Sequence, residues 1–299
     1  MYHSFQEILE RVKSRGKVTV SVAAAQDLEV LEAIKLAHEA GIANAILVGD
    51  EAQIKPMLDK AGLPANTPII NEPDTSQAAL KAVSLVHKGE AQVLMKGLVN
   101  SSDFLRAVLN KEEGLRTGRL LSHLAAFEIP GQHKLLFVTD GGMNIAPNLQ
   151  EKKDILISSM LTLNAMGIDM PRVAILTANE IVNPKMPATV DAKALADMSA
   201  AGELPPGIVE GPIAFDVAVS SEAAKHKKIK SQVAGQVDLI VAPNIETGNS
   251  IGKTLIYYAG AKMAGLVLGA ANPIVMTSRA ETAEGKLNSI ALACLGLPQ

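Results

Sequence analysis

Residues 271–286 read ANPIVMTSRAETAEGK, and this stretch gives the clearest indication of the fold. Pro273 precedes a short apolar run, Ile274 to Met276, which predicts a buried strand because it is brief, partly β-branched and bounded by chain-breaking residues. Apolar residues then recur at helical spacing behind Glu281 and Glu284, which predicts a helix with both glutamates in its opening turns. A strand that leads directly into a helix is the repeating unit of an α/β sheet.

Ser278 and Arg279 fall between the predicted strand and the predicted helix. Ligands of open α/β sheets bind outside the carboxyl ends of the strands, where helix N-termini present unpaired N–H groups to anions. A hydroxyl beside a guanidinium at this point therefore indicates a phosphate or carboxylate site. An N-cap serine followed by a solvated arginine explains the same two residues without a ligand, and this stretch alone leaves both readings open.

The amino-terminal third of the chain repeats the alternation of strand and helix. Continuous apolar strands that alternate with amphipathic helices are typical of a parallel sheet covered on both faces. The segments that carry this pattern are strands near 18–22, 45–48, 68–70 and 92–95, and helices near 4–16, 27–40, 51–61 and 74–87. This region therefore predicts a doubly wound α/β layer.

The alternation stops after Arg106. Two strand-like runs, 119–127 and 133–139, are joined through Pro130, Gly131 and Gln132, which is too short for a crossover helix and predicts an antiparallel hairpin. Mixed pairing of this kind often marks a second domain. Beyond the hairpin the rhythm resumes, with helices expected near 150–166, 191–200, 215–224 and 248–264 and strands near 173–177, 238–242 and 266–269.

Polar or glycine-rich loops follow several of the predicted strands. They are residues 96–103, 140–144 and 244–249, together with the loop at Ser278. Each loop taken alone is typical of an ordinary turn. Glycines in such a loop also allow the backbone to approach a ligand closely. Four such loops in one α/β chain favour a shared binding cleft.

Composition excludes several classes of protein. Aromatic residues make up only 3% of the 299 residues, and the net charge is -3, so neither base stacking nor a polyanion-binding field favours nucleic acid as a partner. A single cysteine, no apolar leader and no apolar run of membrane-spanning length predict a cytoplasmic protein that does not enter a membrane. The six histidines have no paired spacing, so no metal site is expected.

The order of several motifs resembles the phosphate acyltransferase family, which includes acetyl and butyryl enzymes. The segments that carry the resemblance are 100–106, 140–144, 211–216, 233–235, 243–249 and 271–279, and together they span nearly the whole chain. The length near 300 residues and the form of segments 96–100, 114–123 and 140–148 are more similar to the butyryl branch, phosphate butyryltransferase, than to the acetyl branch.

This resemblance implies two doubly wound α/β domains like those of isocitrate and isopropylmalate dehydrogenases, with a cleft between them that holds coenzyme A. The carboxyl-terminal helix would return to the first domain, giving 1–117 with 268–299 as one domain and 118–267 as the other. The implied reaction is reversible acyl transfer between acyl-coenzyme A and inorganic phosphate, without metal or permanently bound cofactor. A butyryl or branched short acyl group and a homodimer are expected.

The resemblance also implies site residues. Ser278 and Arg279 would contact the transferred phosphate and stabilise charge on the tetrahedral intermediate, and Arg106 would be a second anion ligand. We expect further contacts to phosphate or coenzyme A from Ser101, Ser102, Asn144, Glu246, Gly248 and Asn249.

One departure from the family pattern concerns the proton acceptor. The acetyl branch carries an aspartate six residues after the arginine, proposed there to deprotonate the thiol, whereas this chain has Gly285. Glu284 is adjacent and is the favoured catalytic carboxylate, with Glu281 one turn earlier. A positive field that lowers the thiol pKa without a carboxylate is the open alternative. Phosphate acetyltransferase, a dehydrogenase of the same fold and a non-catalytic binding module remain rival functions.

Overall fold

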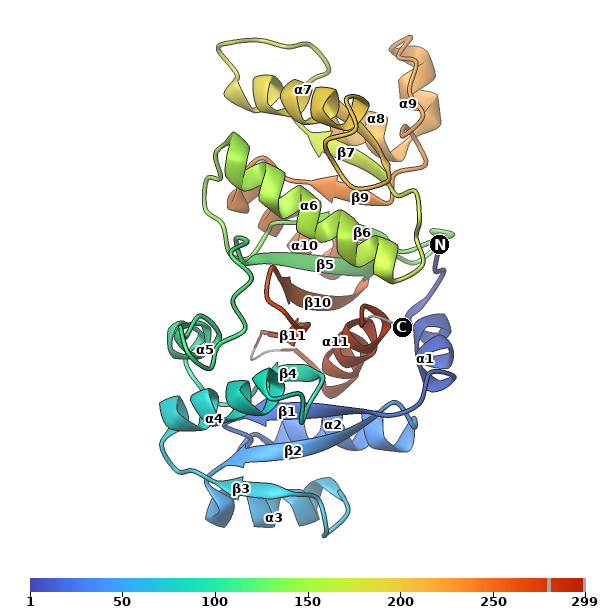
Figure 1. Ribbon diagram of the computed structural model, residues 1–299. Coiled ribbons are helices and arrows are strands. Elements are labelled where there is room, and N and C mark those ends of the chain that lie inside the picture. Colours follow the sequence, from blue (N-terminus) through green and yellow to red (C-terminus); the bar gives the residue numbers. More distant parts are fainter. Residues whose placement is uncertain (279–280, 298–299) are drawn as a thin grey trace. The chain divides into compact units, whose positions relative to one another are not determined.

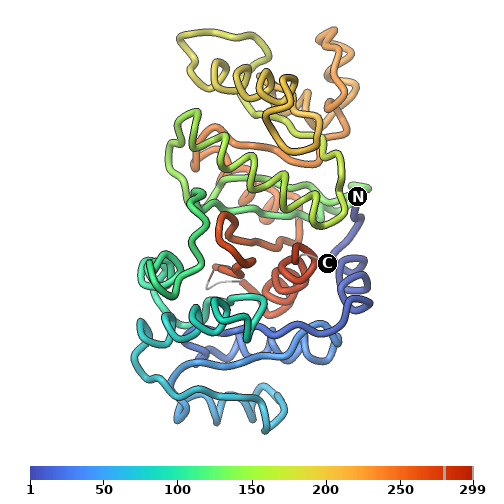
Figure 2. Tube along the Cα trace, viewed as in Figure 1, coloured from blue at the N-terminus to red at the C-terminus, as the bar shows by residue number. Residues whose placement is uncertain are grey.

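The structure is a computed structural model that describes residues 1–278 and 281–297. The chain divides into two compact units (Figure 1). The first unit comprises Tyr2–Arg119 and Met263–Gln299, and the second unit comprises Leu120–Lys262. Figure 2 shows the first unit as blue-to-green and red segments, which are its two stretches of sequence.

The first unit is built on a mostly parallel sheet with the order β3-β2-β1-β4-β11-β10. Strands β3, β2, β1, β4 and β11 are parallel, and β10 pairs antiparallel with β11 through Val267 and Ile274. The strands are β1 (Val18–Ala23), β2 (Ala43–Gly49), β3 (Ile69–Asn71), β4 (Val93–Lys96), β10 (Lys262–Leu268) and β11 (Ile274–Val275). The sheet therefore joins residues from both ends of the chain.

Helices lie on both faces of this sheet, with α4 on one face and α2 on the other (Figure 1). The helices are α1 (Phe5–Lys13), α2 (Leu28–Glu39), α3 (Glu51–Ala61), α4 (Thr75–His87), α5 (Ser101–Val108) and α11 (Ala283–Leu295). Side chains of Ser4, Asp27, Asp50 and Asp74 accept hydrogen bonds from first-turn N–H groups and fix where the first four helices begin.

Helix α11 is the central helix of the first unit. All residues from Gly285 to Leu295 are buried, and α1 and α2 both pack against it. A helix that is buried on all sides needs neighbours on all sides, which explains why the last helix packs among elements from the start of the chain. Arg15 reinforces this packing by donating to the carbonyl of Leu295 at 2.7 Å.

The second unit has the sheet order β5-β6-β9-β7-β8, in which β5 and β6 form an antiparallel hairpin and the other neighbours are parallel. Its strands are β5 (Ser122–Glu128), β6 (Leu136–Thr139), β7 (Arg172–Leu176), β8 (Ile208–Ile213) and β9 (Leu239–Val241). Its helices are α6 (Leu149–Ala165), α7 (Pro187–Ala200), α8 (Phe215–Val219), α9 (Ser221–His226) and α10 (Ile245–Tyr257). The predicted hairpin and the α/β class are confirmed.

Three expected elements differ from the structure. The helix predicted near 215–224 is two short helices, because Ser220 leaves the helical conformation and its side chain caps α9 at Ala223. Strand β8 was not predicted from the sequence. The helix expected near 248–264 is α10, which begins at Ile245 and ends at Tyr257. Helix α11 begins after the Thr282 cap, so Glu281 precedes the helix and does not lie in its opening turn.

Candidate functional site

In the first unit, the carboxyl ends of neighbouring strands bring two predicted loops to one edge of the sheet. Strands β4 and β11 pair in parallel, with Met95 beside Val275, so the loops that begin after Lys96 and after Met276 leave the same edge. The edge that these loops share is the position where open α/β sheets bind ligands. Ser278 lies beyond the end of β11, between strand and helix as the sequence predicted, and it is exposed.

Lys96 is a candidate that was not among the predicted site residues. It ends β4 and is only 8% exposed, and its Nζ lies 3.4 Å from the carbonyl oxygen of Gly97. Lysine is rarely buried without a reason, because desolvation penalises its charge. A lysine that ends an otherwise apolar buried strand is the sequence signal that could have identified it.

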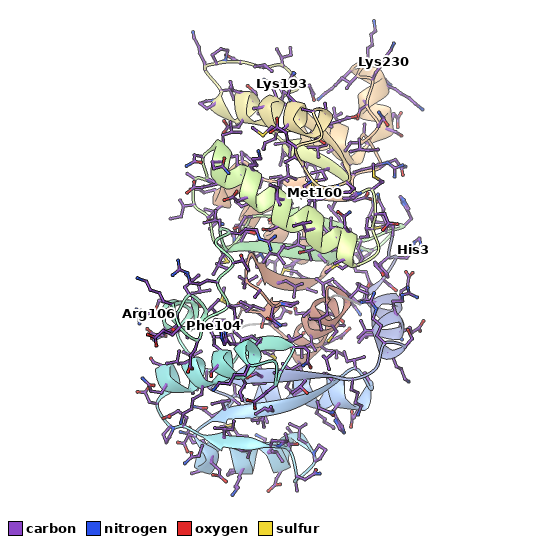
Figure 3. All side chains as sticks on the ribbon, viewed as in Figure 1. His3, Phe104, Arg106, Met160, Lys193 and Lys230 are labelled. Carbon is purple, nitrogen blue, oxygen red and sulfur yellow. The ribbon has the colours of Figure 1, made fainter. Side chains whose placement is uncertain are left out.

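The loop after β4 leads into α5, whose first turn contains Ser101 and Ser102. Both serines are exposed, and the Asn100 side chain makes no cap hydrogen bond in this turn. Arg106 lies on the outer side of the same helix, whereas Phe104 points inward and is fully buried (Figure 3). The guanidinium of Arg106 donates to Asp103 at 2.7 Å, and 75% of its side chain is exposed. Arg106 is therefore accessible to an anion but already holds one carboxylate.

The turn between β11 and α11 contains two glutamates in different surroundings. Glu281 is half-buried, its N–H donates to the carbonyl of Ser278 at 3.0 Å, and Glu284 in the first turn of α11 is exposed. A Cβ added at Gly285 would lie 2.1 Å from Oε1 of Glu281. The carboxylate of Glu281 therefore occupies the space that a side chain at position 285 would need. Arg279 lies outside the described residues.

In the second unit, two predicted loops meet because β6 and β9 are adjacent and parallel, with Thr139 beside Val241. Gly141 lies against the first turn of α10, where a Cβ would approach the backbone of Gly248 at 2.6 Å. Asn249 closes the contact by donating from Nδ2 to the carbonyl of Gly141 at 3.1 Å. Only glycine fits at these two positions, since any side chain would separate the loop from the helix.

Asp140 organises the loop that follows β6. Its carboxylate is buried and accepts hydrogen bonds from the N–H groups of Gly142 at 2.8 Å and Met143 at 3.0 Å. It also accepts from the backbone N–H of Asn144 at 3.2 Å and from its Nδ2 at 2.6 Å. The amide Nδ2 of Asn144 donates in addition to the carbonyl of Leu121 at 2.9 Å. Asn144, predicted as a ligand, thus holds the loop in place with its amide nitrogen.

The remaining predicted residues of the second unit lie at the start of α10. Asn244 caps the helix by accepting from Thr247 N–H at 3.0 Å, Gly248 is buried, and Glu246 and Asn249 are exposed. The structure therefore brings the loop that contains Asn144 against the helical turn that contains Gly248 and Asn249. In the described part of the chain, no group of three or more His, Cys, Asp or Glu side chains is arranged to hold a metal ion. Within the same residues, no helix is long and apolar enough to cross a bilayer.

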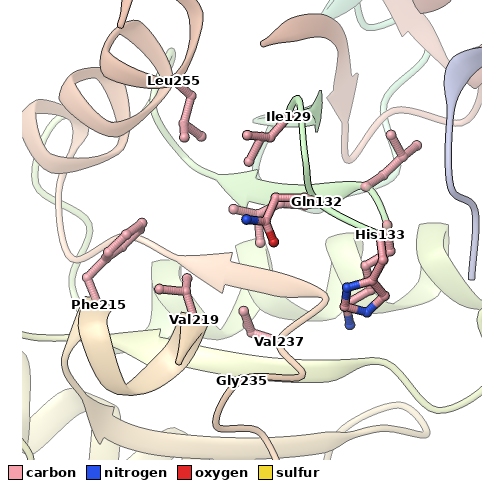
Figure 4. Close-up of a pocket in the computed structure, with 11 residues that line it drawn as sticks. Ile129, Gln132, His133, Phe215, Val219, Gly235, Val237 and Leu255 are labelled. Carbon is pink, nitrogen blue, oxygen red and sulfur yellow. The ribbon is translucent and has the colours of Figure 1, made fainter. Parts of the chain in front are cut away.

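A pocket of about 210 Å³ in the second unit lies at the opposite ends of the strands (Figure 4). It is lined mainly by apolar side chains, including Leu136 at the start of β6, Phe215 and Leu255. A second pocket, of about 630 Å³ in the first unit, is lined by Thr19, Asn44 and Pro68 at the amino ends of its strands. Neither pocket contains a predicted site residue, so neither marks the ligand edge.

Comparisons with known proteins agree on one family. The family described as phosphate acetyl/butaryl transferase matches residues 65–294. Phosphate butyryltransferase of Clostridium acetobutylicum is 50% identical over 296 residues, which cover 99% of this chain and 98% of the relative. The crystal structure of a branched-chain phosphotransacylase from Enterococcus faecalis is 31% identical, with a TM-score of 0.84 over 93% of this chain and 98% of that chain.

A more distant neighbour concerns the fold alone. The 4-hydroxythreonine-4-phosphate dehydrogenase of Klebsiella pneumoniae superposes with a TM-score of 0.60 over 94% of this chain and 100% of that chain, at 14% identity. The similarity to a dehydrogenase agrees with the fold expected from the sequence. At this identity it says nothing about activity.

Proposed function

We propose an activity for this chain on one premise: it belongs to the phosphate acetyl/butyryl transferase family. It catalyses the reversible transfer of an acyl group between coenzyme A and inorganic phosphate, giving an acyl phosphate and free coenzyme A. The observation that carries this conclusion is 50% identity to a phosphate butyryltransferase along almost the whole length of both chains. Coenzyme A and phosphate are substrates, and the proposal includes no permanently bound cofactor and no metal.

The acyl group in this proposal is short, either butyryl or a branched chain. Support comes from the names of two similar proteins, the clostridial phosphate butyryltransferase and the enterococcal branched-chain phosphotransacylase. Acetyl is the competing substrate, because the family includes acetyltransferases. Values of kcat/KM for acetyl-, butyryl-, isobutyryl- and isovaleryl-coenzyme A decide between them, and acetyl as the best substrate would contradict the assignment.

Ser278, Arg279 and Glu284 line the reacting centre in this proposal, and Ser101, Ser102 and Arg106 supply further contacts to phosphate or coenzyme A. The position of Ser278 beyond the end of β11 and the accessibility of Arg106 support these assignments. Lys96 adds a buried positive charge at the same edge of the first unit. A phosphoryl group carries about two negative charges near neutral pH, so positively charged side chains at this edge would bind it favourably.

The proposal also assigns to ligand binding four residues of the second unit, namely Asn144, Glu246, Gly248 and Asn249. Support comes from the way these loops pack at the carboxyl ends of β6 and β9, where Gly141 and Gly248 bring two backbones into contact. The domain division predicted from the sequence, 1–117 with 268–299 and 118–267, lies close to the two units and remains a proposal.

Two further proposals follow from the family resemblance, namely a homodimer and a cytoplasmic location. The mass of the assembly in solution, measured by light scattering, should be twice the 31.4 kDa of one chain. A mass of 31.4 kDa at micromolar concentration would contradict the dimer. Fractionation of the source cells, with the activity recovered away from membranes, tests the location.

The experiment that tests the activity measures thiol release from butyryl-coenzyme A. Release should require phosphate and should proceed without nicotinamide or added divalent metal. Release that is independent of phosphate would indicate a thioesterase, and a requirement for nicotinamide would indicate a dehydrogenase. Binding of acyl-coenzyme A without any turnover would indicate a non-catalytic binding module.

A further inference from the structure

Leu98 presents an exposed apolar side chain at the ligand edge of the first unit. It is the second residue after β4, whose carboxyl end lies beside the carboxyl ends of β1 and β11. Leu98 is 45% exposed, whereas Lys96 and Val99 are buried. A single exposed leucine is common on a protein surface, so its meaning depends on where it lies.

The position of Leu98 in the first unit is the topological switch point of the sheet. From β1 the chain proceeds to β2 and β3 on one side, and it then crosses to β4 on the other side of β1. In open α/β sheets, ligands bind in the crevice outside the carboxyl ends of the two strands where the order reverses. Leu98 therefore lies where this topology creates a ligand site.

Hydrogen bonds fix the backbone that carries Leu98. The N–H of Gly97 donates to the carbonyl of Ala23 at 2.9 Å, and the N–H of Leu98 donates to the carbonyl of Ala24 at 2.7 Å. The N–H of Val99 donates to the carbonyl of Gly97 at 3.0 Å. A Cβ at Gly97 would lie 2.3 Å from the carbonyl oxygen of Ala24, so only glycine allows this approach. The loop after β4 is thus tied to the loop after β1, and Leu98 is held at one point of the edge.

The polar groups assigned to this edge give an acyl chain nothing apolar to contact. Hydroxyl, ammonium, guanidinium and carboxylate groups suit a phosphate or a reacting carbonyl, and they are supplied by Lys96, Ser101, Ser102, Arg106, Ser278, Arg279 and Glu284. Among the described residues of the loops that follow β1, β4 and β11, Leu98 has the exposed large apolar side chain. Met276, which directly follows β11, is half-buried at the same edge.

We propose that Leu98 contacts the acyl chain of acyl-coenzyme A and favours butyryl and branched acyl groups over acetyl, an inference that rests on the proposed acyl transfer. The loops that contain Leu98 and Ser278 leave neighbouring strands, which lie roughly 4.8 Å apart, and a butyryl chain is of similar length. A substrate whose carbonyl reacts beside Ser278 therefore extends its chain over Leu98. Acetyl ends too close to the carbonyl to gain this contact. Leu98 takes no part in bond making and acts on specificity alone.

The test compares kcat/KM for butyryl-, isovaleryl- and acetyl-coenzyme A in Leu98→Ala and in the wild type. One methylene in an apolar pocket changes kcat/KM by ~10-fold or more, so Leu98→Ala should lower the ratio of butyryl to acetyl by about 10-fold. KM for phosphate should not change. Leu98→Trp, whose larger side chain shortens the space for the chain, should lower kcat/KM for isovaleryl-coenzyme A more than for acetyl-coenzyme A. Leu109→Ala is the matched control and should keep the wild-type ratio, because Leu109 is also 45% exposed but lies at the other end of α5.

Three results would overturn the inference. They are an unchanged ratio in Leu98→Ala, an equal loss of kcat/KM for all three substrates in that variant, and a fall of the ratio in Leu109→Ala as large as in Leu98→Ala. An equal loss would indicate a disturbed loop and not a lost contact with the chain. Circular dichroism checks that the variants fold, and if Leu98→Ala does not, the ratio of isovaleryl to acetyl in Leu98→Trp decides. A wild-type enzyme without phosphate-dependent turnover would instead refute the proposed function.

Discussion

Replacement of Asp140 should destabilise the second unit by an amount that follows from its hydrogen bonds. The buried carboxylate accepts four, three from backbone N–H groups and one from the Asn144 amide. Hydrogen bonds to a charged group contribute about 1.5–3 kcal/mol each. Gly142 is exposed and Met143 and Asn144 are half-buried, so water replaces part of what is lost. We therefore expect Asp140→Ala to lower the free energy of unfolding by about 2–4 kcal/mol.

The assay is urea unfolding followed by circular dichroism. With a slope of about 3 kcal/mol per molar urea, a loss of about 3 kcal/mol moves the midpoint about 1 M lower with the slope unchanged. Asp140→Asn keeps one carbonyl acceptor and should fall between the wild type and the alanine variant. Asp197→Asn is the matched control, because Asp197 is exposed and its ion pair with Lys193 should contribute under 1 kcal/mol.

The same variants report on His123, the second residue of β5, whose ring lies beside Gly142. Burial lowers the pKa of His123 and the negative charge of Asp140 opposes this shift, so the pKa of His123, measured by NMR titration, should fall further in Asp140→Asn. A stability loss below about 0.5 kcal/mol in Asp140→Ala would refute the hydrogen-bond reasoning. An unchanged pKa of His123 in Asp140→Asn would show that Asp140 does not act on this ring.

Three further predictions test other parts of the account. Arg279→Ala should lower turnover by ~10²–10³, and Arg279→Lys should recover only part of it, since lysine lacks the planar fork that binds two phosphate oxygens; near wild-type turnover in the alanine variant would remove Arg279 from the site. Burial raises the pKa of Cys294 to about 12, so in the native enzyme at pH 8 a thiol reagent should leave it unmodified for hours and should titrate one thiol per chain after denaturation. Prompt labelling of the native protein would show that α11 opens readily. Gly248→Ala should cost several kcal/mol or detach the loop, because its Cβ would lie 2.7 Å from the carbonyl oxygen of Asp140; unchanged thermal stability and activity would contradict the close packing.

The sequence located most of the strand ends but could not reveal which of them are neighbours. Residues 140–144 and 244–249 were recognised separately from their glycines and polar residues. Their contact depends on the parallel pairing of β6 with β9, which lie about a hundred positions apart in sequence. Strand order is a property of the tertiary fold, and hydrophobic periodicity carries little information about it.

Lys96 shows why a candidate site residue can be missed. Lys96 belongs to the loop 96–103, which the sequence analysis had selected as a possible binding loop. Its burial depends on the neighbouring strands and could not be predicted from the sequence. Ser278 was easier to place because a short apolar run bounded by proline marks the end of its strand.

The turn at Glu281 shows a limit of a different kind. Periodicity placed both glutamates in the opening turns of one helix, whereas the Thr282 cap excludes Glu281. Its carboxylate then folds back over Gly285, a contact that requires the absence of a side chain at that position. One side chain here fills the space of another, and this depends on how the chain packs in three dimensions. The spacing of residues in the sequence does not show it.

The most direct test of the central claim measures both products of one reaction. The enzyme is given butyryl-coenzyme A and phosphate, released coenzyme A is measured with a thiol reagent, and acyl phosphate is trapped with hydroxylamine. Acyl transfer to phosphate predicts one trapped acyl phosphate for each thiol released, and no release when phosphate is left out. Thiol release without a matching amount of acyl phosphate would contradict the account.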